Sequence, residues 1–286
     1  MLILLNRIIL TIFISAVSFS AFSEEMNTNY LKTDWSFKGI FGTFDRASLQ
    51  RGYQVYQEVC SGCHSVQHLS YRNLSEKGGP EFSVEEAKAI AAQFEVEDGP
   101  NSDGEMFMRP GRLSDTFVKP YPNVEASTAA NGGAYPPDMS VLTKARKGGA
   151  NYIYSLLLGY EEAPTGFELD EGVYYNKYMT GNKIKMTTPL SDGLVEYSDG
   201  TQSTTTQMAK DVTTFLVWVA EPHLESQHRM GFKSIIYLII LFILVYMSKQ
   251  KVWSRFDSKK EPEEETFDKV ERAVTEYEGE DPKTFK

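Results

Sequence analysis

The residues best suited to chemistry form the run Cys60-Ser61-Gly62-Cys63-His64, which holds the only two cysteines of the 286-residue chain. Cys-x-x-Cys-His is the attachment signature of c-type haem. Each thiol adds across one vinyl group of the porphyrin, and the histidine supplies an axial bond to the iron. The motif therefore predicts one haem c bound covalently through Cys60 and Cys63, with His64 as a ligand of the iron.

Three other uses of two closely spaced cysteines fit this sequence less well. A redox dithiol is expected beside a thioredoxin-like βαβ pattern, which the surrounding residues lack. A zinc site needs two further ligands at similar spacing, and no second cysteine pair exists. A structural disulfide between Cys60 and Cys63 would be strained. Haem attachment remains the favoured interpretation.

The second axial position of the iron calls for a thioether if the protein transfers electrons, because soft sulfur favours Fe(II) and raises the reduction potential. The methionines weighed for this role are Met26, Met106, Met108, Met139, Met179, Met186 and Met208. Met186 is favoured because it lies in a loop well downstream of His64, and Pro189 stiffens that loop. Met106 and Met108 are interpreted as packing residues at the haem edge.

A helix must deliver the motif, and its pattern is visible before Cys60. Asp45 is a plausible N-cap, and Leu49, Tyr53, Tyr56 and Val59 follow at helical spacing. A second helix is expected from Val84 to about Phe94. Ser83 and Glu86 are placed there as a capping box.

Outside these two helices, residues 24–229 alternate between aromatic, turn-rich and helical stretches. Residues 24–45 are expected to form an extended arm laid over the core. Residues 98–137 carry turn signals and no helix or strand signals, but their aromatic content predicts an ordered wrap around the cofactor. Helices are expected over 138–158, interrupted at 145–149, and over 206–220.

The two ends of the chain carry membrane-related signals. Residues 1–23 read as a secretory signal peptide, with an uncleaved anchor as the alternative. Residues 230–248 read as one transmembrane helix with thirteen consecutive uncharged residues from Ile235 to Met247, and a buried core helix is the alternative.

Charge sets the expected orientation. Five Lys and Arg residues follow the span within a dozen positions, which predicts a cytoplasmic C-terminus and a haem domain, residues 24–229, in the periplasm of a cell with an inner membrane. Residues 249–286 would be an acidic, solvated and partly disordered tail.

The net charge of −10 lies in the exported part, since residues 24–229 hold 18 Lys plus Arg and 28 Asp plus Glu, and 18 − 28 gives −10. An acidic surface argues against nucleic acid as a partner. Such a surface would attract a basic protein and speed its encounter, or it could serve solubility alone.

A longer set of motifs resembles the cytochrome c1 family, the haem c subunit of the cytochrome bc1 complex. The similar runs, in the family's order, lie at residues 50–56, 71–74, 98–111, 119–123, 130–138, 145–149 and 154–160. The match extends from about residue 35 to residue 255. It implies a mainly α fold, a class I c-type cytochrome domain with long loop insertions plus one C-terminal transmembrane helix.

The resemblance also implies roles for particular residues. Met186 falls on the family's axial methionine, and Arg146 falls on an arginine that pairs with a haem propionate. Tyr152 takes the place of a tyrosine near the other propionate. Asn131 and Pro137 belong to a loop that packs against the haem. The sequence departs from many bacterial members in having no further cysteines for a disulfide.

The function implied is that of an electron-transfer subunit in the respiratory chain. Single electrons would pass from the Rieske iron–sulfur protein to a cytochrome c acceptor, within a quinol–cytochrome c oxidoreductase that also contains cytochrome b and is expected to be dimeric. Two alternatives stay open. One is a solitary membrane-anchored cytochrome carrier, and the other is a haem sensor with an open coordination site.

Overall fold

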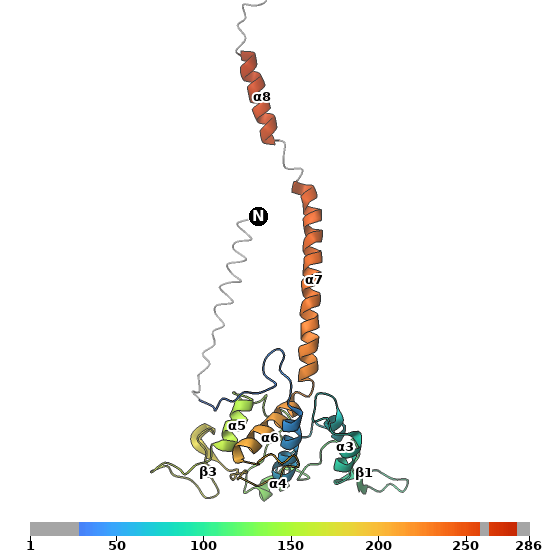
Figure 1. Ribbon diagram of the computed structural model, residues 1–286, viewed down its shortest axis with the longest axis vertical. Helices are drawn as coiled ribbons and strands as arrows, with labels where there is room; N and C mark the ends of the chain where they lie inside the picture. Colours follow the sequence, from blue (N-terminus) through green and yellow to red (C-terminus); the bar gives the residue numbers. More distant parts are fainter. Residues whose placement is uncertain (1–28, 258–262, 279–286) are drawn as a thin grey trace, which may run out of the picture. The chain divides into compact units, whose positions relative to one another are not determined.

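A computed structural model describes residues 29–257 and 263–278, and it is mainly helical (Figure 1). The described chain divides into two compact units. The first contains residues up to Ser36 and Phe44–Pro222, and the second contains Phe37–Thr43 and the residues from His223 onward. The predicted mainly α class with one long apolar C-terminal helix is confirmed.

The helix predicted ahead of the haem motif is present, but its last part has a different winding. Helix α2 spans Arg46–Val55, and the Asp45 side chain caps it by accepting from the amide of Ala47. A single π-helical turn, Tyr56–Cys60, follows without a break. The amide of Ser61 donates to the carbonyl of Tyr56, which closes this wider turn at 2.8 Å.

Helix α6, Thr205–Ala220, packs against α2 and forms the centre of the first unit. Gly52 permits close approach, since a Cβ at this position would lie 2.2 Å from the carbonyl oxygen of Asp211. Aromatic rings fill the rest of the contact. Phe215 lies 5.8 Å from Tyr53 and 5.7 Å from Tyr56 between ring centroids. Their burial supplies most of the apolar stabilisation here.

A buried charged cluster fixes the same helix pair. The carboxylate of Asp211 is fully buried, and it accepts from Ser48 Oγ at 2.6 Å and from Arg51 Nε at 2.9 Å. Gln207 Nε2 donates to it as well, at 2.9 Å. Arg51 also reaches Asp199 at the surface. The buried carboxylate therefore has donors on α2 and α6 that compensate its desolvation.

The N-terminal arm lies over α5, Ala150–Leu158, as expected. The indole nitrogen of Trp35 donates to Asn151 Oδ1 at 2.7 Å, and the amide of Leu31 donates to Ser155 Oγ at 2.8 Å. Trp35 is buried. Residues 29–36 of the arm are therefore a fixed part of the first unit.

The remaining elements of the first unit are short. They are the 3₁₀ turns Tyr71–Ser75 and Thr180–Asn182, helices α3 (Val84–Ala91) and α4 (Val124–Ala130), and strands β1 (Glu95–Asp98), β2 (Phe107–Pro110), β3 (Tyr174–Tyr175) and β4 (Lys183–Ile184). Strands β1 and β2 form one antiparallel hairpin, and β3 and β4 form another. The capping box of Ser83 and Glu86 at the start of α3 is confirmed.

The expectation that residues 98–137 contain neither helix nor strand is wrong, although this segment is ordered. Its turn residues close the β1–β2 hairpin, where the side chain of Asn101 accepts from the amides of Asp103 and Glu105. Arg109 holds the hairpin base through Asp98 and Asp115. Helix α4 begins because Asn123 caps it by accepting from the amide of Ala126. Turn residues therefore also mark element ends inside this segment.

The helix expected over 138–144 is also wrong, because this stretch forms turns. The side chain of Asp138 contacts the chain that follows His64. Its carboxylate accepts from Ser65 Oγ at 2.7 Å and from the amide of Gln67 at 3.0 Å. These bonds tie the chain after Pro137 to the chain after His64 in place of a helix.

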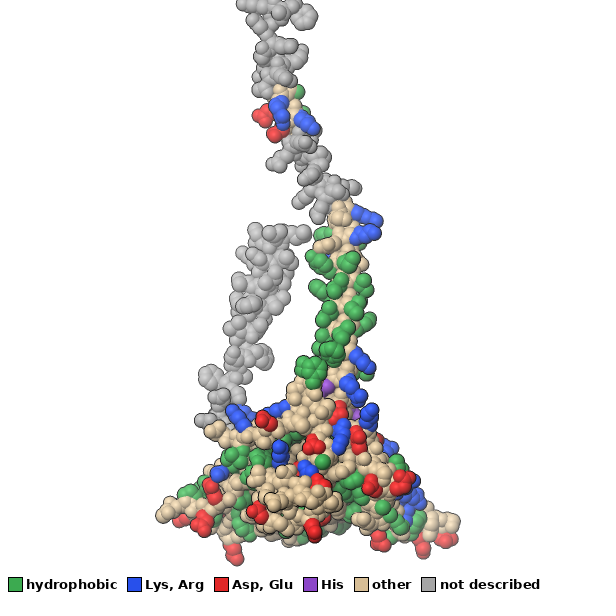
Figure 2. All heavy atoms as spheres, viewed as in Figure 1, with side chains coloured by type: hydrophobic (Ala, Val, Ile, Leu, Met, Phe, Trp, Pro, Cys, Tyr) green, Lys and Arg blue, Asp and Glu red, His purple; other side chains and the backbone are tan. Residues whose placement is uncertain are grey.

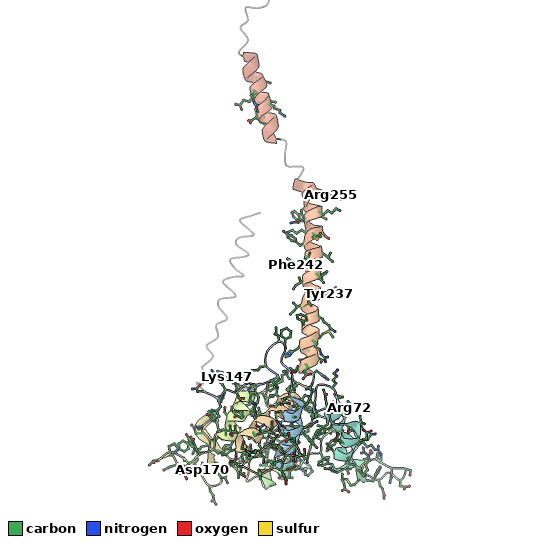
Figure 3. All side chains as sticks on the ribbon, viewed as in Figure 1. Arg72, Lys147, Asp170, Tyr237, Phe242 and Arg255 are labelled. Atoms are coloured by element: carbon green, nitrogen blue, oxygen red, sulfur yellow. The ribbon has the colours of Figure 1, made fainter. Side chains whose placement is uncertain are left out.

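The second unit contains α7, Leu224–Asp257, which is long and apolar enough to cross a membrane. Its most apolar 18-residue window has no buried share. This exposure contradicts the buried core helix and fits one membrane anchor. Figure 2 shows hydrophobic side chains along α7 with Lys and Arg at both ends, and Figure 3 labels Tyr237, Phe242 and Arg255 along it.

After α7 the chain forms another helix, α8, Glu263–Glu278. The described side chains of this helix, residues 267–274, are exposed, as a solvated tail requires. Phe267, Val270 and Val274 recur at helical spacing, and charged residues lie between them. This amphipathic pattern favours a helix. The predicted signal peptide, residues 1–23, and Met26 lie outside the described residues.

Asp211→Ala should destabilise the protein strongly. It removes the buried carboxylate that accepts from Arg51 and Ser48. Loss of one partner of a buried ion pair lowers the free energy of unfolding by about 3–5 kcal/mol. Thermal unfolding followed by circular dichroism measures this. Asp199→Ala, which removes an exposed partner of the same arginine, is the matched control and should lower Tm far less. Equal losses for both variants would contradict the assignment.

Candidate functional site

The haem motif begins at Cys60, the last residue of the π-helical turn, and continues through a tight turn. The amide of His64 donates to the carbonyl of Cys60 at 2.9 Å, and the amide of Cys63 donates to the same carbonyl at 3.1 Å. Single π turns inside helices are frequent at functional sites. The turn brings both cysteines and His64 onto one short stretch of backbone.

Both thiols are free, so neither is used in a disulfide. Cys63 is exposed and Cys60 is half-buried. Burial raises the pKa of the Cys60 thiol to about 12, with a smaller contribution from Cys63. Among residues 29–257 and 263–278, no three His, Cys, Asp or Glu side chains gather into a site that could hold a metal ion unaided. Two thiols followed directly by an imidazole are the donor set by which haem c is attached and its iron is ligated.

The imidazole of His64 is oriented by a backbone carbonyl. Its Nδ1 lies 2.8 Å from the carbonyl oxygen of Pro137. A carbonyl can only accept, so Nδ1 carries the proton and Nε2 keeps its lone pair for a metal. Burial lowers the pKa of His64, against the smaller opposing effects of the Pro137 bond and Asp138, and so favours the neutral ring.

Met186 lies in the loop that follows strand β4, and its side chain is half-buried. Two contacts tie this loop to the rest of the first unit. The hydroxyl of Tyr160 donates to the carbonyl of Met186 at 3.1 Å. The ammonium of Lys185 donates to the carbonyl of Gly132 at 3.3 Å.

One segment, residues 131–137, touches both candidate ligand regions. At its start Gly132 binds the Met186 loop, and at its end Pro137 binds His64. Asn131 anchors the segment to α4, because its side-chain amide donates to the carbonyl of Ser127 at 2.7 Å. Gly132 and Pro137 are five positions apart in the chain, so their Cα atoms lie at most about 18 Å apart. This arrangement fits a haem between the two loops.

Arg146 and Tyr152 form a second pair near the start of α5. Burial raises the pKa of Tyr152, and the positive charge of Arg146 opposes that shift. The Tyr152 hydroxyl donates to the sulfur of Met179 at 3.6 Å, and its ring lies 5.4 Å from the ring of Tyr30. In the described part of the chain, no hydrogen bond joins this pair to His64 or to the Met186 loop.

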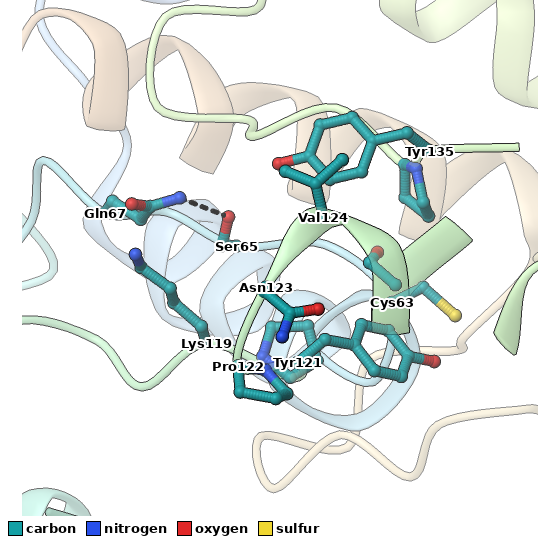
Figure 4. Close-up of a pocket in the computed structure, with 12 residues that line it drawn as sticks. Cys63, Ser65, Gln67, Lys119, Tyr121, Pro122, Asn123, Val124 and Tyr135 are labelled. Carbon is teal, nitrogen blue, oxygen red and sulfur yellow. Dashed lines mark hydrogen bonds between the residues drawn. The ribbon is translucent and has the colours of Figure 1, made fainter. Parts of the chain in front are cut away.

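A small cavity of about 80 Å³ lies beside Cys63 (Figure 4). Its lining includes Lys119, Tyr121, Asn123 and Tyr135, and Gln67 donates to Ser65 at its rim. Sites for small molecules usually measure about 300–1,000 Å³. The cavity is thus too small for a porphyrin and is a gap next to the attachment turn.

Sequence reasoning missed the contacts of Pro137 and Tyr160. The Pro137 carbonyl orients His64, whereas the resemblance implied only packing for this residue. Tyr160 belongs to the run at 154–160 that supported the resemblance, but nothing in its residue type indicated a bond to the Met186 backbone. Both contacts use a main-chain carbonyl, which leaves no trace in the sequence.

Before haem is attached, Cys63 should be alkylated faster than Cys60. Cys63 is exposed, whereas Cys60 is half-buried and its raised pKa reduces the reactive thiolate. Mass spectrometry of apoprotein made without haem maturation measures the two rates. Denatured apoprotein is the control and should lose most of the difference. Faster reaction at Cys60 in the folded apoprotein would contradict this geometry.

Comparisons with known proteins agree with the motif and the fold. The model of the cytochrome C1 family matches residues 35–256. A potato protein named cytochrome c1-2, heme protein, mitochondrial, is 50% identical over 226 residues, covering 79% of this chain and 86% of its own length. A Saccharomyces cerevisiae cytochrome c1, heme protein, is 48% identical over 227 residues, covering 79% and 72%.

A bacterial relative is longer than this chain. The protein from Bradyrhizobium diazoefficiens named cytochrome b/c1 is 49% identical over 239 residues, which cover 77% of this chain but 35% of that protein. The match thus spans about a third of the relative's length. The family model covers most of the present chain, including the haem motif, the residue 131–137 segment and the Met186 loop. The chain belongs to the cytochrome C1 family.

Proposed function

We propose that this chain is the haem subunit of a cytochrome bc1 complex and passes single electrons from a Rieske iron–sulfur protein to a cytochrome c acceptor. Members of its family carry a covalently bound haem c. A relative from Candida albicans is named cytochrome b-c1 complex catalytic subunit. These likenesses support a place in a membrane-bound oxidoreductase. Cytochrome b is proposed as a further partner, and the complex is proposed to be dimeric.

Cys60 and Cys63 are the attachment points of the haem, and His64 is its first axial ligand. The observation that carries this assignment is the hydrogen bond from His64 Nδ1 to the carbonyl of Pro137, which leaves Nε2 available. Carbonyl acceptors of this kind orient metal-binding histidines and strengthen their basicity. Pro137 thus has a positioning role in addition to packing.

Met186 is the second axial ligand. Support comes from its loop, which Lys185 joins to the same 131–137 segment that holds His64. A sulfur ligand favours Fe(II) and raises the potential. Bound haem c supplies a one-electron couple, while the chain keeps both ligand loops fixed and so keeps structural change during electron transfer small.

Arg146 and Tyr152 are proposed to hold the propionates. Arg146 is exposed and carries a fixed positive charge beside the Tyr152 hydroxyl, so the pair offers a cation and a donor to carboxylates. The hydroxyl would exchange its weak bond to the Met179 sulfur for a charged acceptor. Asn131 holds the loop that packs against the haem by capping α4.

The charge of the protein and helix α7 support its proposed partner and its proposed location. Residues 24–229 carry the net charge of −10, which favours encounter with a basic cytochrome c and disfavours nucleic acid. Helix α7 supports a single-pass anchor in an inner membrane. The predicted signal peptide and the basic residues after the span support a periplasmic haem domain and a cytoplasmic C-terminus.

Met186→Leu should leave the haem covalently attached but remove its sixth ligand. The reduction potential should fall markedly, and quinol-to-cytochrome c turnover should stop. The reduced haem should then bind carbon monoxide avidly, whereas the wild-type protein binds it poorly. Met179→Leu is a matched control that should keep both properties near wild type. An unchanged potential in Met186→Leu would mean that another residue is the ligand.

Mild detergent should extract this chain together with a cytochrome b and a Rieske protein. Partner subunits embedded in the same membrane hold it through contacts that such detergents preserve. Blue-native electrophoresis with mass spectrometry of the haem-stained band measures the association. A lone haem protein no larger than this chain, which is 32.3 kDa with residues 1–23 included, would instead favour a solitary membrane-anchored carrier.

A further inference from the structure

The hydrogen bond from the Tyr160 hydroxyl to the Met186 carbonyl is not explained by packing alone. We propose that Tyr160 is a positioning residue that clamps the Met186 loop and so keeps the thioether on the iron. The inference rests on the proposed role of Met186 as axial ligand. It assigns a function in haem ligation to a side chain that lies just after α5.

The Met186 loop has few other restraints. It begins where strand β4 ends at Ile184 and stops at the buried residue Leu190. Within the described residues, the Tyr160 hydroxyl is the one hydrogen-bond partner of the backbone between Lys185 and Pro189. The loop therefore depends on Tyr160 at the residue whose side chain would bind iron.

Tyr160 itself is held on a rigid base. It forms an isolated β-bridge with Asn176, a fully buried residue. The side-chain amide of Asn176 donates to the carbonyl of Leu156 at 2.8 Å, which ties the bridge to α5. A Cβ at Gly159 would lie 2.6 Å from Asn176 Oδ1, so these segments are in close contact.

A second contact from the same loop is weaker. Lys185 donates to the carbonyl of Gly132 at 3.3 Å. Its side chain is exposed, so water competes with this carbonyl for the ammonium and weakens the bond. The half-buried phenol of Tyr160 at 3.1 Å has less competition from water. Tyr160 is therefore the main restraint, and Lys185 adds a lesser link to the segment that orients His64.

The clamp has a measurable consequence for ligand exchange. An external ligand of Fe(II) can bind only when the Met186 thioether leaves the iron, so its apparent affinity reports how often the loop opens. Removal of a single hydrogen bond of ordinary net strength should increase that opening roughly 2- to 10-fold. The haem would stay attached, since its thioether links to Cys60 and Cys63 are untouched.

Tyr160→Phe in the intact membrane complex tests the clamp. Carbon monoxide should bind the reduced haem roughly 2- to 10-fold more tightly than in wild type, as expected from one lost hydrogen bond. The charge-transfer absorption of the ferric iron–sulfur bond should disappear at a lower temperature. Tyr154→Phe is the matched control, because it removes a hydroxyl from α5, the helix that precedes Tyr160, and Tyr154 contacts Trp35. This control should behave as wild type.

Comparison with Met186→Leu separates failure of the clamp from failure of the proposed ligand. If Met186→Leu binds carbon monoxide avidly but Tyr160→Phe matches wild type, the clamp is overturned and the ligand assignment stands. If Met186→Leu leaves carbon monoxide binding unchanged, the ligand assignment itself is overturned, and the clamp with it. Increased binding by Tyr154→Phe to the same extent would show a general loosening of α5 and would also overturn the clamp.

Discussion

The arrangement of the haem site depends on one hydrogen bond, from His64 Nδ1 to the carbonyl of Pro137. It fixes the tautomer of the imidazole and joins the attachment turn to a segment far along the chain. That segment also contacts the Met186 loop through Gly132. The two proposed ligand regions are thus positioned by a common piece of backbone, and movement of residues 131–137 would disturb both.

The attachment turn needs a stable base, and the pairing of α2 with α6 provides it. Gly52 allows the two backbones to approach closely, and Asp211 links them through Arg51 and Ser48. The aromatic rings around Phe215 bury the remaining surface. Because α2 leads directly into the motif, the rigidity of this helix pair is passed to Cys60 without an intervening loop.

Local signals in the sequence predicted the elements that depend on side chains near each other in the chain. Asp45 marked the start of α2, Ser83 and Glu86 marked α3, and the spacing of Cys60, Cys63 and His64 indicated haem. Contacts made through the backbone could not be predicted in this way. The backbone carbonyls of Pro137 and Met186 can accept hydrogen bonds whatever the side chain at those positions. Asp138 fits a helical pattern in the sequence, but its carboxylate accepts from Ser65 and Gln67, which are far away in the chain.

The π turn at Tyr56–Cys60 changes the direction in which the first cysteine points. In an uninterrupted α-helix, position 60 would share a face with Leu49, Tyr53 and Tyr56, which are buried in the core. Each residue of an α-helix advances by about 100° around the axis. One extra residue in the turn therefore offsets the sulfur by roughly that angle. The widened turn therefore moves Cys60 away from the face that Leu49, Tyr53 and Tyr56 present to the core, within one continuous helix.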